Sequence, residues 1–181
     1  MGTLATGVAM LGDAAATAGL DIDQLNGMMA TLSQVTIGGS KEASNTLKTL
    51  FANYSTEAAQ KELGKFGISV IDTAGKLREF DTVFQDVVSQ RKAGLIDDSQ
   101  MQALGRAIGG GPRQGKNFTS LVDSAAVYDQ ATAASRMSGG GEAASALATK
   151  LDTVQTAVTN LDTSFQQWAQ TLGTSGGVLD S

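Results

Sequence analysis

Seven residues near the middle of the chain match the spacing of a phosphate-binding loop. Residues 110–116, Gly-Gly-Pro-Arg-Gln-Gly-Lys, fit the pattern G-x-x-x-x-G-K, in which backbone N–H groups surround the phosphates of a nucleotide. The next residue is Asn117, where such loops place the Ser or Thr that binds magnesium, and no apolar strand precedes the run. Pro112 also removes one backbone N–H donor. We therefore interpret the run as a glycine-rich turn between two helices.

Three groups of carboxylates could in principle bind a metal ion or transfer protons. Asp97 is adjacent to Asp98, Asp21 and Asp23 flank an isoleucine, and an aspartate begins the turn at residues 72–75. Acids that precede a helical segment favour helix N-caps over a paired-carboxylate site. The other two groups lack the twelve-residue series of calcium ligands that ends in Glu. No metal ion and no cofactor is expected.

The composition narrows the possible functions further. The chain contains no Cys and no His, which excludes thiol nucleophiles, disulfides, most zinc sites and histidine general bases. Its net charge of −5 argues against specific nucleic-acid binding, which needs clustered Lys and Arg. No run of about 18 uninterrupted apolar residues is present to span a membrane. We find no candidate catalytic residue and expect a protein that is not an enzyme.

Periodic apolar residues and glycine joints predict a mainly α-helical chain. Leu25, Met28, Met29 and Leu32, for example, follow the spacing of one helix face. We expect four parts: the end of a preceding helix at 1–19, a helical core module at 20–111, a connecting helix at 112–138 that resumes near Phe118, and a heptad helix with a flexible tail at 139–181. The core module is predicted to be a helical bundle. Its expected N-caps are Asp21 or Asp23, Ser40, Ser55 or Thr56, Asp81, and Asp97 or Asp98.

One short β-hairpin, at about residues 68–79, interrupts the predicted bundle. Gly67 is expected to end a helix in the left-handed conformation. Residues 68–71 are β-branched except for one serine, residues 72–75 form a turn, and residues 76–78 alternate polar and apolar side chains. The residues that define this motif are Gly67, Ile68, Val70, Asp72, Gly75 and Leu77.

The last segment carries an unbroken heptad seam, whose members are spaced alternately four and three residues apart. They are Leu147, Leu151, Val154, Val158, Leu161, Phe165, Trp168 and Leu172. The seam can pack either on other copies of the chain or back on the bundle. The large side chains of Phe165 and Trp168 favour a three-stranded core over a tight dimer.

The hairpin motif also carries a resemblance to a known family. Residues 67–78, Gly-Ile-Ser-Val-Ile-Asp-Thr-Ala-Gly-Lys-Leu-Arg, lie between two amphipathic helices and resemble the core region of phage tail tape measure proteins of the TP901 type. Two flanking pieces, residues 36–43 and residues 104–107, are similar to the same family pattern. The resemblance covers about residues 20 to 125.

The resemblance implies a structural segment that sets the length of the tail tube during assembly and leaves the tube on infection. It implies a place in the virion, in the lumen of the tail tube, after synthesis in the host cytoplasm. The implied partners are other copies of the chain, tail tube proteins, tail tip or baseplate proteins, and tail assembly chaperones. Two alternatives stay open: a membrane-active segment that contacts the host membrane after ejection and aids DNA passage, and a generic oligomeric helical scaffold.

Overall fold

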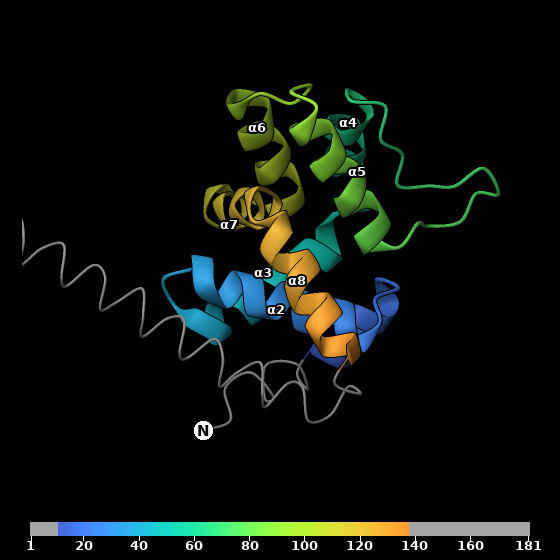
Figure 1. Cartoon of the computed structure of the whole chain (residues 1–181). Coiled ribbons are helices and arrows are strands. Elements are labelled where there is room, and N and C mark those ends of the chain that lie inside the picture. The colour runs from blue at the N-terminus through green and yellow to red at the C-terminus, as the bar shows by residue number, and fades with distance from the viewer. Residues whose placement is uncertain (1–10, 138–181) are drawn as a thin grey trace, which may run out of the picture.

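The computed structural model describes residues 11–137, and helices make up most of this part of the chain (Figure 1). Residues 11–17 are helical and are followed by seven further helices. These are α2 (Ile22–Val35), α3 (Gly39–Asn53), α4 (Glu57–Gly64), α5 (Phe80–Lys92), α6 (Asp98–Gly109), α7 (Pro112–Asp123) and α8 (Ala125–Met137). The predicted mainly α class is confirmed.

Two close helix pairs organise the bundle. Helix α8 packs along α2, and α6 packs along α7, while α3 contacts both α2 and the α6–α7 pair. Helix α4 lies against α6, and α5 lies against α7. Each helix buries one apolar face; on α2 this face is the predicted stripe, and Leu25, Met28, Met29 and Leu32 are at most 1% exposed.

Aromatic rings connect the helices through the centre of the core. The ring of Phe80 lies 5.1 Å from that of Phe51 and 6.4 Å from that of Phe84. Phe84 in turn contacts Phe118 of α7 at 6.4 Å and Tyr128 of α8 at 5.4 Å, both edge to face. Edge-to-face pairs at these distances add stabilisation beyond buried area. Helices α3, α5, α7 and α8 therefore share one core.

Most of the predicted helix starts agree with the structure. Asp21 and Asp97 accept hydrogen bonds from the backbone N–H of Gln24 and Gln100, whose side chains bond back to the cap residue. These two capping boxes satisfy backbone donors that would otherwise lack a partner. Thr56 caps α4 in the same way with a single bond, to the N–H of Ala59.

The predicted caps at Ser40 and Asp81 are wrong. The N-cap of helix α3 is Gly38, two residues earlier than predicted, and Ser40 lies in the first turn of the helix. Helix α5 is preceded by Glu79, so that Asp81 also lies in the first turn. Asp81 is instead used by a tertiary contact, described below. The helix expected to resume near Phe118 already begins at Pro112, a residue well suited to the first position of a helix.

The predicted β-hairpin at residues 68–79 is also wrong, because the described residues contain no strand. One isolated antiparallel bridge joins Ile71 and Leu77. Two residues of the first predicted strand, Ile68 and Val70, are buried in the helical core, at 4% and 2% exposure. The residues that remain for pairing could form only a short two-stranded ribbon. Such a ribbon gains little stability without a third strand. Residues 68–79 form a projecting connection between α4 and α5, here called the arm (Figure 1).

Candidate functional site

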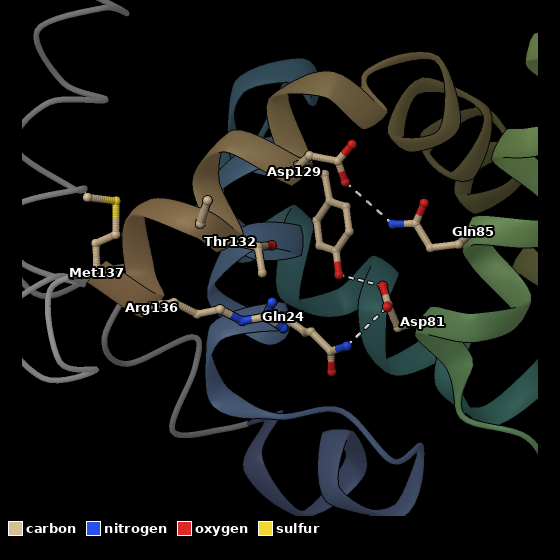
Figure 2. Close-up of a pocket in the computed structure, with 9 residues that line it drawn as sticks. Gln24, Asp81, Gln85, Asp129, Thr132, Arg136 and Met137 are labelled. Carbon is tan, nitrogen blue, oxygen red and sulfur yellow. Dashed lines mark hydrogen bonds between the residues drawn. The ribbon is translucent and has the colours of Figure 1, made fainter.

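An open groove of about 400 Å³ lies between α2, α5 and α8 (Figure 2). Met137 lies at one end of it and Gln85 at the other. The lining residues are Gln24, Asp81, Gln85, Tyr128, Asp129, Thr132, Ala133, Arg136 and Met137. The polar part of the groove lining thus consists of amides, carboxylates, hydroxyls and one guanidinium.

Asp81 is the centre of the polar contacts in this groove. Its Oδ1 accepts the hydroxyl hydrogen of Tyr128, and its Oδ2 accepts a bond from Gln24 Nε2 at 3.0 Å. Tyr128 is 2% exposed, and burial together with the neighbouring Asp81 carboxylate raises the pKa of its phenol. The phenol therefore stays protonated and acts as a donor. The Asp81 carboxylate thus connects α5 to α2 and α8. Because both of its oxygens accept hydrogen bonds, it is poorly placed to transfer a proton.

The outer contacts of the groove are weaker. Arg136 Nη2 lies 3.4 Å from Asp21 Oδ2, with both side chains more than half exposed. Gln85 Nε2 lies 3.5 Å from Asp129 Oδ1. Exposed pairs of this kind contribute little to the free energy of unfolding.

Small and polar residues hold α8 on α2. Asn26 Nδ2 donates to Ser135 Oγ at 3.1 Å, and the Ser135 hydroxyl donates to Asp23. Gly27 gives the two helices room to approach, because a Cβ at this position would lie 2.1 Å from the hydroxyl oxygen of Thr132. The interface is therefore closely packed and partly polar.

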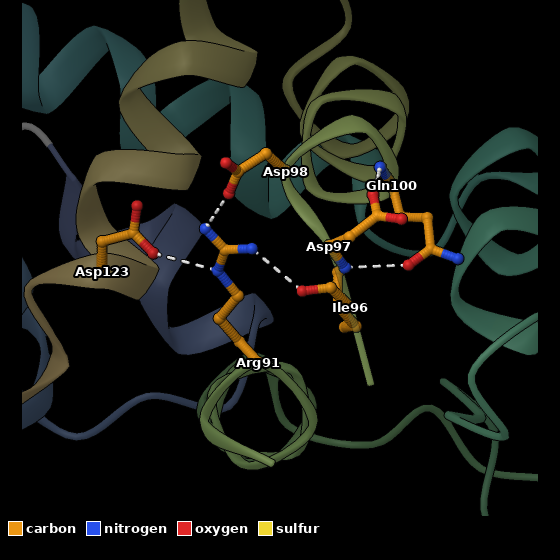
Figure 3. Close-up of polar contacts among 6 residues, drawn as sticks. All are labelled: Arg91, Ile96, Asp97, Asp98, Gln100 and Asp123. Carbon is orange, nitrogen blue, oxygen red and sulfur yellow. Dashed lines mark hydrogen bonds and ion pairs between the residues drawn. The ribbon is translucent and has the colours of Figure 1, made fainter. Parts of the chain in front are cut away.

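A second polar cluster surrounds Arg91 at the end of α5 (Figure 3). Its guanidinium donates to Asp98 at 2.5 Å, to Asp123 at 3.3 Å and to the carbonyl of Ile96 at 2.9 Å. The hydrogen bond to Asp98 raises the pKa of Arg91, and burial acts in the opposite direction. Asp97 meanwhile caps α6. The cap at Asp97 agrees with the helix-cap interpretation, whereas the contact of Asp98 with Arg91 was not predicted.

The run that matches a phosphate-binding loop does not form a loop. Gly110 has a φ of 65° and ends α6, and α7 begins two residues later at Pro112. Gly115 lies inside α7 against α6, where a Cβ would lie 2.8 Å from the backbone of Gly105. Gly110 therefore ends a helix, and Gly115 allows two helices to cross closely. The expected turn between the helices is present and is short.

Neither a metal-binding cluster nor a membrane-spanning helix is found within residues 11–137. No group of three or more Asp or Glu side chains in this part of the chain is arranged to hold a metal ion. No helix there combines the length and the apolar character needed to cross a bilayer.

Five of the six residues of the predicted hairpin motif lie in the arm, and Gly67 directly precedes it. Gly67 has a φ of 71° and Gly75 a φ of 79°, so both adopt the left-handed conformation. Ile68 and Val70 are buried, whereas Asp72 and Leu77 are exposed. The predicted self-association seam from Leu147 to Leu172 lies outside the described residues.

A comparison with protein families identifies the chain. Residues 1–110 match the model of a family described as phage-related minor tail protein. The chain belongs to this family. No curated protein and no solved structure matches the chain. The minor tail protein is a structural component of the phage tail and is associated with the virion.

The family match ends at the boundary between α6 and α7, but the core does not. Phe118 and Leu121 of α7 and Tyr128 of α8 belong to the same buried cluster as the residues of α2 to α6. The groove likewise needs α8, which lies beyond the match. Sequence reasoning did not anticipate that Gln24, Asp81 and Tyr128 meet; each was predicted only as part of its own helix.

Proposed function

We propose that this minor tail protein is a segment of a tail tape measure protein. In this role it sets the length of the tail tube during assembly and leaves the tube on infection. Two observations support the proposal: the chain belongs to a phage minor tail protein family, and residues 67–78 with their flanking helices resemble the core region of tape measure proteins. The family match and the resemblance overlap over residues 20–110.

The helical character of the chain suits a ruler. A helix satisfies its backbone hydrogen bonds internally, so its rise of about 1.5 Å per residue does not depend on a partner. Helices α2 to α8 are between 8 and 15 residues long, and the connections that follow α2, α4, α5 and α6 contain glycine. Such helices could separate from one another while each keeps its own hydrogen bonds, which would convert a bundle into an extended element.

The proposal includes a location and partners. The protein would occupy the lumen of the tail tube, after synthesis in the host cytoplasm. Copies would associate through the seam from Leu147 to Leu172, with a trimer as the favoured state. Tail tube proteins, tail tip or baseplate proteins and tail assembly chaperones would be its other partners.

Tail length measured by electron microscopy tests the ruler. Residues 142–172 are duplicated in frame in one phage and deleted in another. The tails are expected to become longer and shorter, respectively, by about 1.5 Å per residue changed. A third phage carries the duplicated segment with its sequence scrambled, and its tails should match those of the first. Infectious particles of unchanged length in all three would refute the ruler function while leaving the family membership intact.

A further inference from the structure

The arm between α4 and α5 stands clear of the bundle (Figure 1). Its residues 71–77 are all exposed, including the apolar side chains of Ile71 and Leu77, which are 37% and 45% exposed. Its two ends are fixed in the core through Val70 and Phe80, which are 2% and 1% exposed. The arm is thus an exposed protrusion whose two ends are anchored in the core.

Hydrogen bonds within the arm give it a defined shape. The Asp72 carboxylate accepts from the backbone N–H groups of Ala74 and Lys76, each at 2.8 Å. At the root, the Arg78 guanidinium donates to the Ser69 carbonyl at 2.6 Å and pairs with Asp86 of α5 at 2.8 Å. Because hydrogen bonds fix both the turn and the base of the arm, the tip is preorganised. Preorganisation lowers the entropy cost of binding.

The two limbs of the arm present their backbone edges differently. Val70 and Asp72 bond across the arm to Arg78 and Lys76, so the N–H and C=O groups of the bridged pair, Ile71 and Leu77, point outwards. On the Ile71 side, the Ser69 hydroxyl bonds to both the N–H and the C=O of Ile71, at 3.1 and 2.6 Å. On the other side, the N–H and C=O of Leu77 have no partner among the described residues. One edge is therefore blocked and the other is open.

We propose that the Leu77 edge of the arm docks an extended segment of a different tail protein. The segment would pair with the N–H and C=O of Leu77, as in the addition of a strand to an exposed edge. Successive side chains of an extended segment point to opposite faces. One apolar side chain of the segment would therefore pack beside Leu77, on the face that Leu77 shares with Ile71, and a carboxylate on a neighbouring residue would meet Lys76 on the other face.

The charge of the arm supports this partner. Lys76 forms no ion pair within the described part of the chain, while the carboxylate of Asp72 is occupied by backbone N–H groups. The tip therefore offers a free ammonium beside its apolar pair, which is complementary to an acidic residue next to an apolar one. The inference rests on the family membership and does not depend on the ruler function.

Photo-crosslinking in assembled tails tests the docking edge. A photoreactive amino acid is placed at Ala74, at the tip of the arm, in the full-length protein as the phage encodes it. The matched control position is Leu95, an apolar residue that is 61% exposed on the turn after α5. We expect a crosslink from the tip to a different tail protein, identified by mass spectrometry, and a much weaker yield from Leu95.

Substitutions at Leu77 distinguish backbone hydrogen bonding at the edge from nonspecific apolar contact. Leu77→Pro removes the outward N–H but keeps an apolar side chain, whereas Leu77→Ile keeps both. We expect Leu77→Pro to reduce the crosslink from the tip about tenfold, the size expected for a lost hydrogen bond with its neighbouring contacts, and Leu77→Ile to have little effect. Lys76→Glu should also reduce the yield. Equal urea midpoints of the variants would verify that the fold is retained.

Three results would overturn the proposal. These are crosslinks only to other copies of the same chain, equal yields from Ala74 and Leu95, or equal yields from the Leu77→Pro and Leu77→Ile proteins. Tail length is not part of this readout, so failure of the docking edge and failure of the ruler would be seen separately.

Discussion

Gly115 shows how a single missing side chain sets the distance between two helices. A Cβ at this position would lie 2.8 Å from the backbone of Gly105 and Arg106. On the opposite helix, a Cβ at Gly109 would lie 2.4 Å from the N of Gly115. Contacts this close involve backbone atoms, which cannot rotate away as a side chain can. The α6–α7 crossing therefore requires glycine on both helices.

We predict that Gly115→Ala lowers the free energy of unfolding by about 2 kcal/mol, because the added methyl group forces the helices apart. Gly64→Ala is the matched control, since Gly64 is also helical and a Cβ there meets nothing within 4 Å. The control should be neutral or slightly stabilising. Urea unfolding followed by circular dichroism measures both. A loss of stability of similar size in the two variants would contradict the packing explanation.

Tyr128 should make the stability of the protein dependent on pH in the alkaline range. Burial raises the pKa of its phenol, so above about pH 10 the unfolded chain loses this proton while the folded protein keeps it. The unfolded state then binds fewer protons, and the free energy of unfolding falls as the pH rises. The contribution from Tyr128 is fully present below about pH 10 and decreases above it.

We predict that Tyr128→Phe costs about 2 kcal/mol at neutral pH, because the bond to the Asp81 carboxylate is lost. The difference from the parent protein should shrink above pH 10, since the variant lacks this titrating group. Tyr54→Phe is the control: its hydroxyl donates to a neutral carbonyl, that of Arg78, and about 1 kcal/mol is expected. Urea unfolding at neutral and alkaline pH gives both values. A difference that stays constant with pH would refute the role assigned to Tyr128.

At the scale of the elements, the helix starts depend on local caps that the sequence reveals. At the start of α6, Asp97 and Gln100 each accept a hydrogen bond of 2.8 Å from the backbone N–H of the other. Both bonds lie within residues 97–100, so this helix start needs no distant partner. The neighbouring Asp98 contacts Arg91 instead, and its side chain is 87% exposed. Two adjacent aspartates thus stabilise the same helix start by different means.

We predict that Asp97→Ala lowers the free energy of unfolding by about 1 kcal/mol, because an N–H donor of α6 loses its acceptor. Asp98→Ala should cost less, since an exposed ion pair is screened by solvent and salt. Unfolding in urea at low and at high salt distinguishes the two, because only the Asp98 effect should diminish as salt is added. Equal losses that respond equally to salt would argue against this division of roles.

At the scale of the whole molecule, the boundary of the family match does not coincide with the boundary of the core. Phe84 of α5 is 1% exposed because Phe118 and Tyr128, from the two helices beyond the match, cover it. Helices α7 and α8 are therefore needed to complete the bundle that α2 to α6 begin.

We predict that a chain ending at Gly111 lacks a cooperative unfolding transition, whereas a chain ending at Met137 retains the transition of the whole protein. The shorter chain would expose the face of α5 around Phe84 and the face of α2 that α8 covers. Urea unfolding, monitored by circular dichroism and by aromatic absorbance, should give coincident curves for the longer chain. The same cooperative transition in both chains would show that α7 and α8 are dispensable.

The features that the sequence alone determined are those that act within a few residues. Apolar side chains at helical spacing predicted the α class and the buried stripe of α2. Three helix starts were each predicted to within two candidate caps, and the structure has Asp21, Thr56 and Asp97 as the caps. Gly67 was recognised as a left-handed position, since glycine adopts a positive φ without steric cost. Each of these signals has its physical cause inside one turn of chain.

Only the tertiary structure decided the features that depend on distant contacts. Asp81 was predicted as a cap, but it binds Tyr128, a residue 47 positions away. The β-branched residues 68–71 predicted a strand, yet Ile68 and Val70 are more stable in the helical core than in a ladder that has no third strand. Gly115 resembled part of a phosphate-binding loop and instead allows two helices to touch. Local patterns cannot distinguish these outcomes, because which residues meet is set by how the helices pack together.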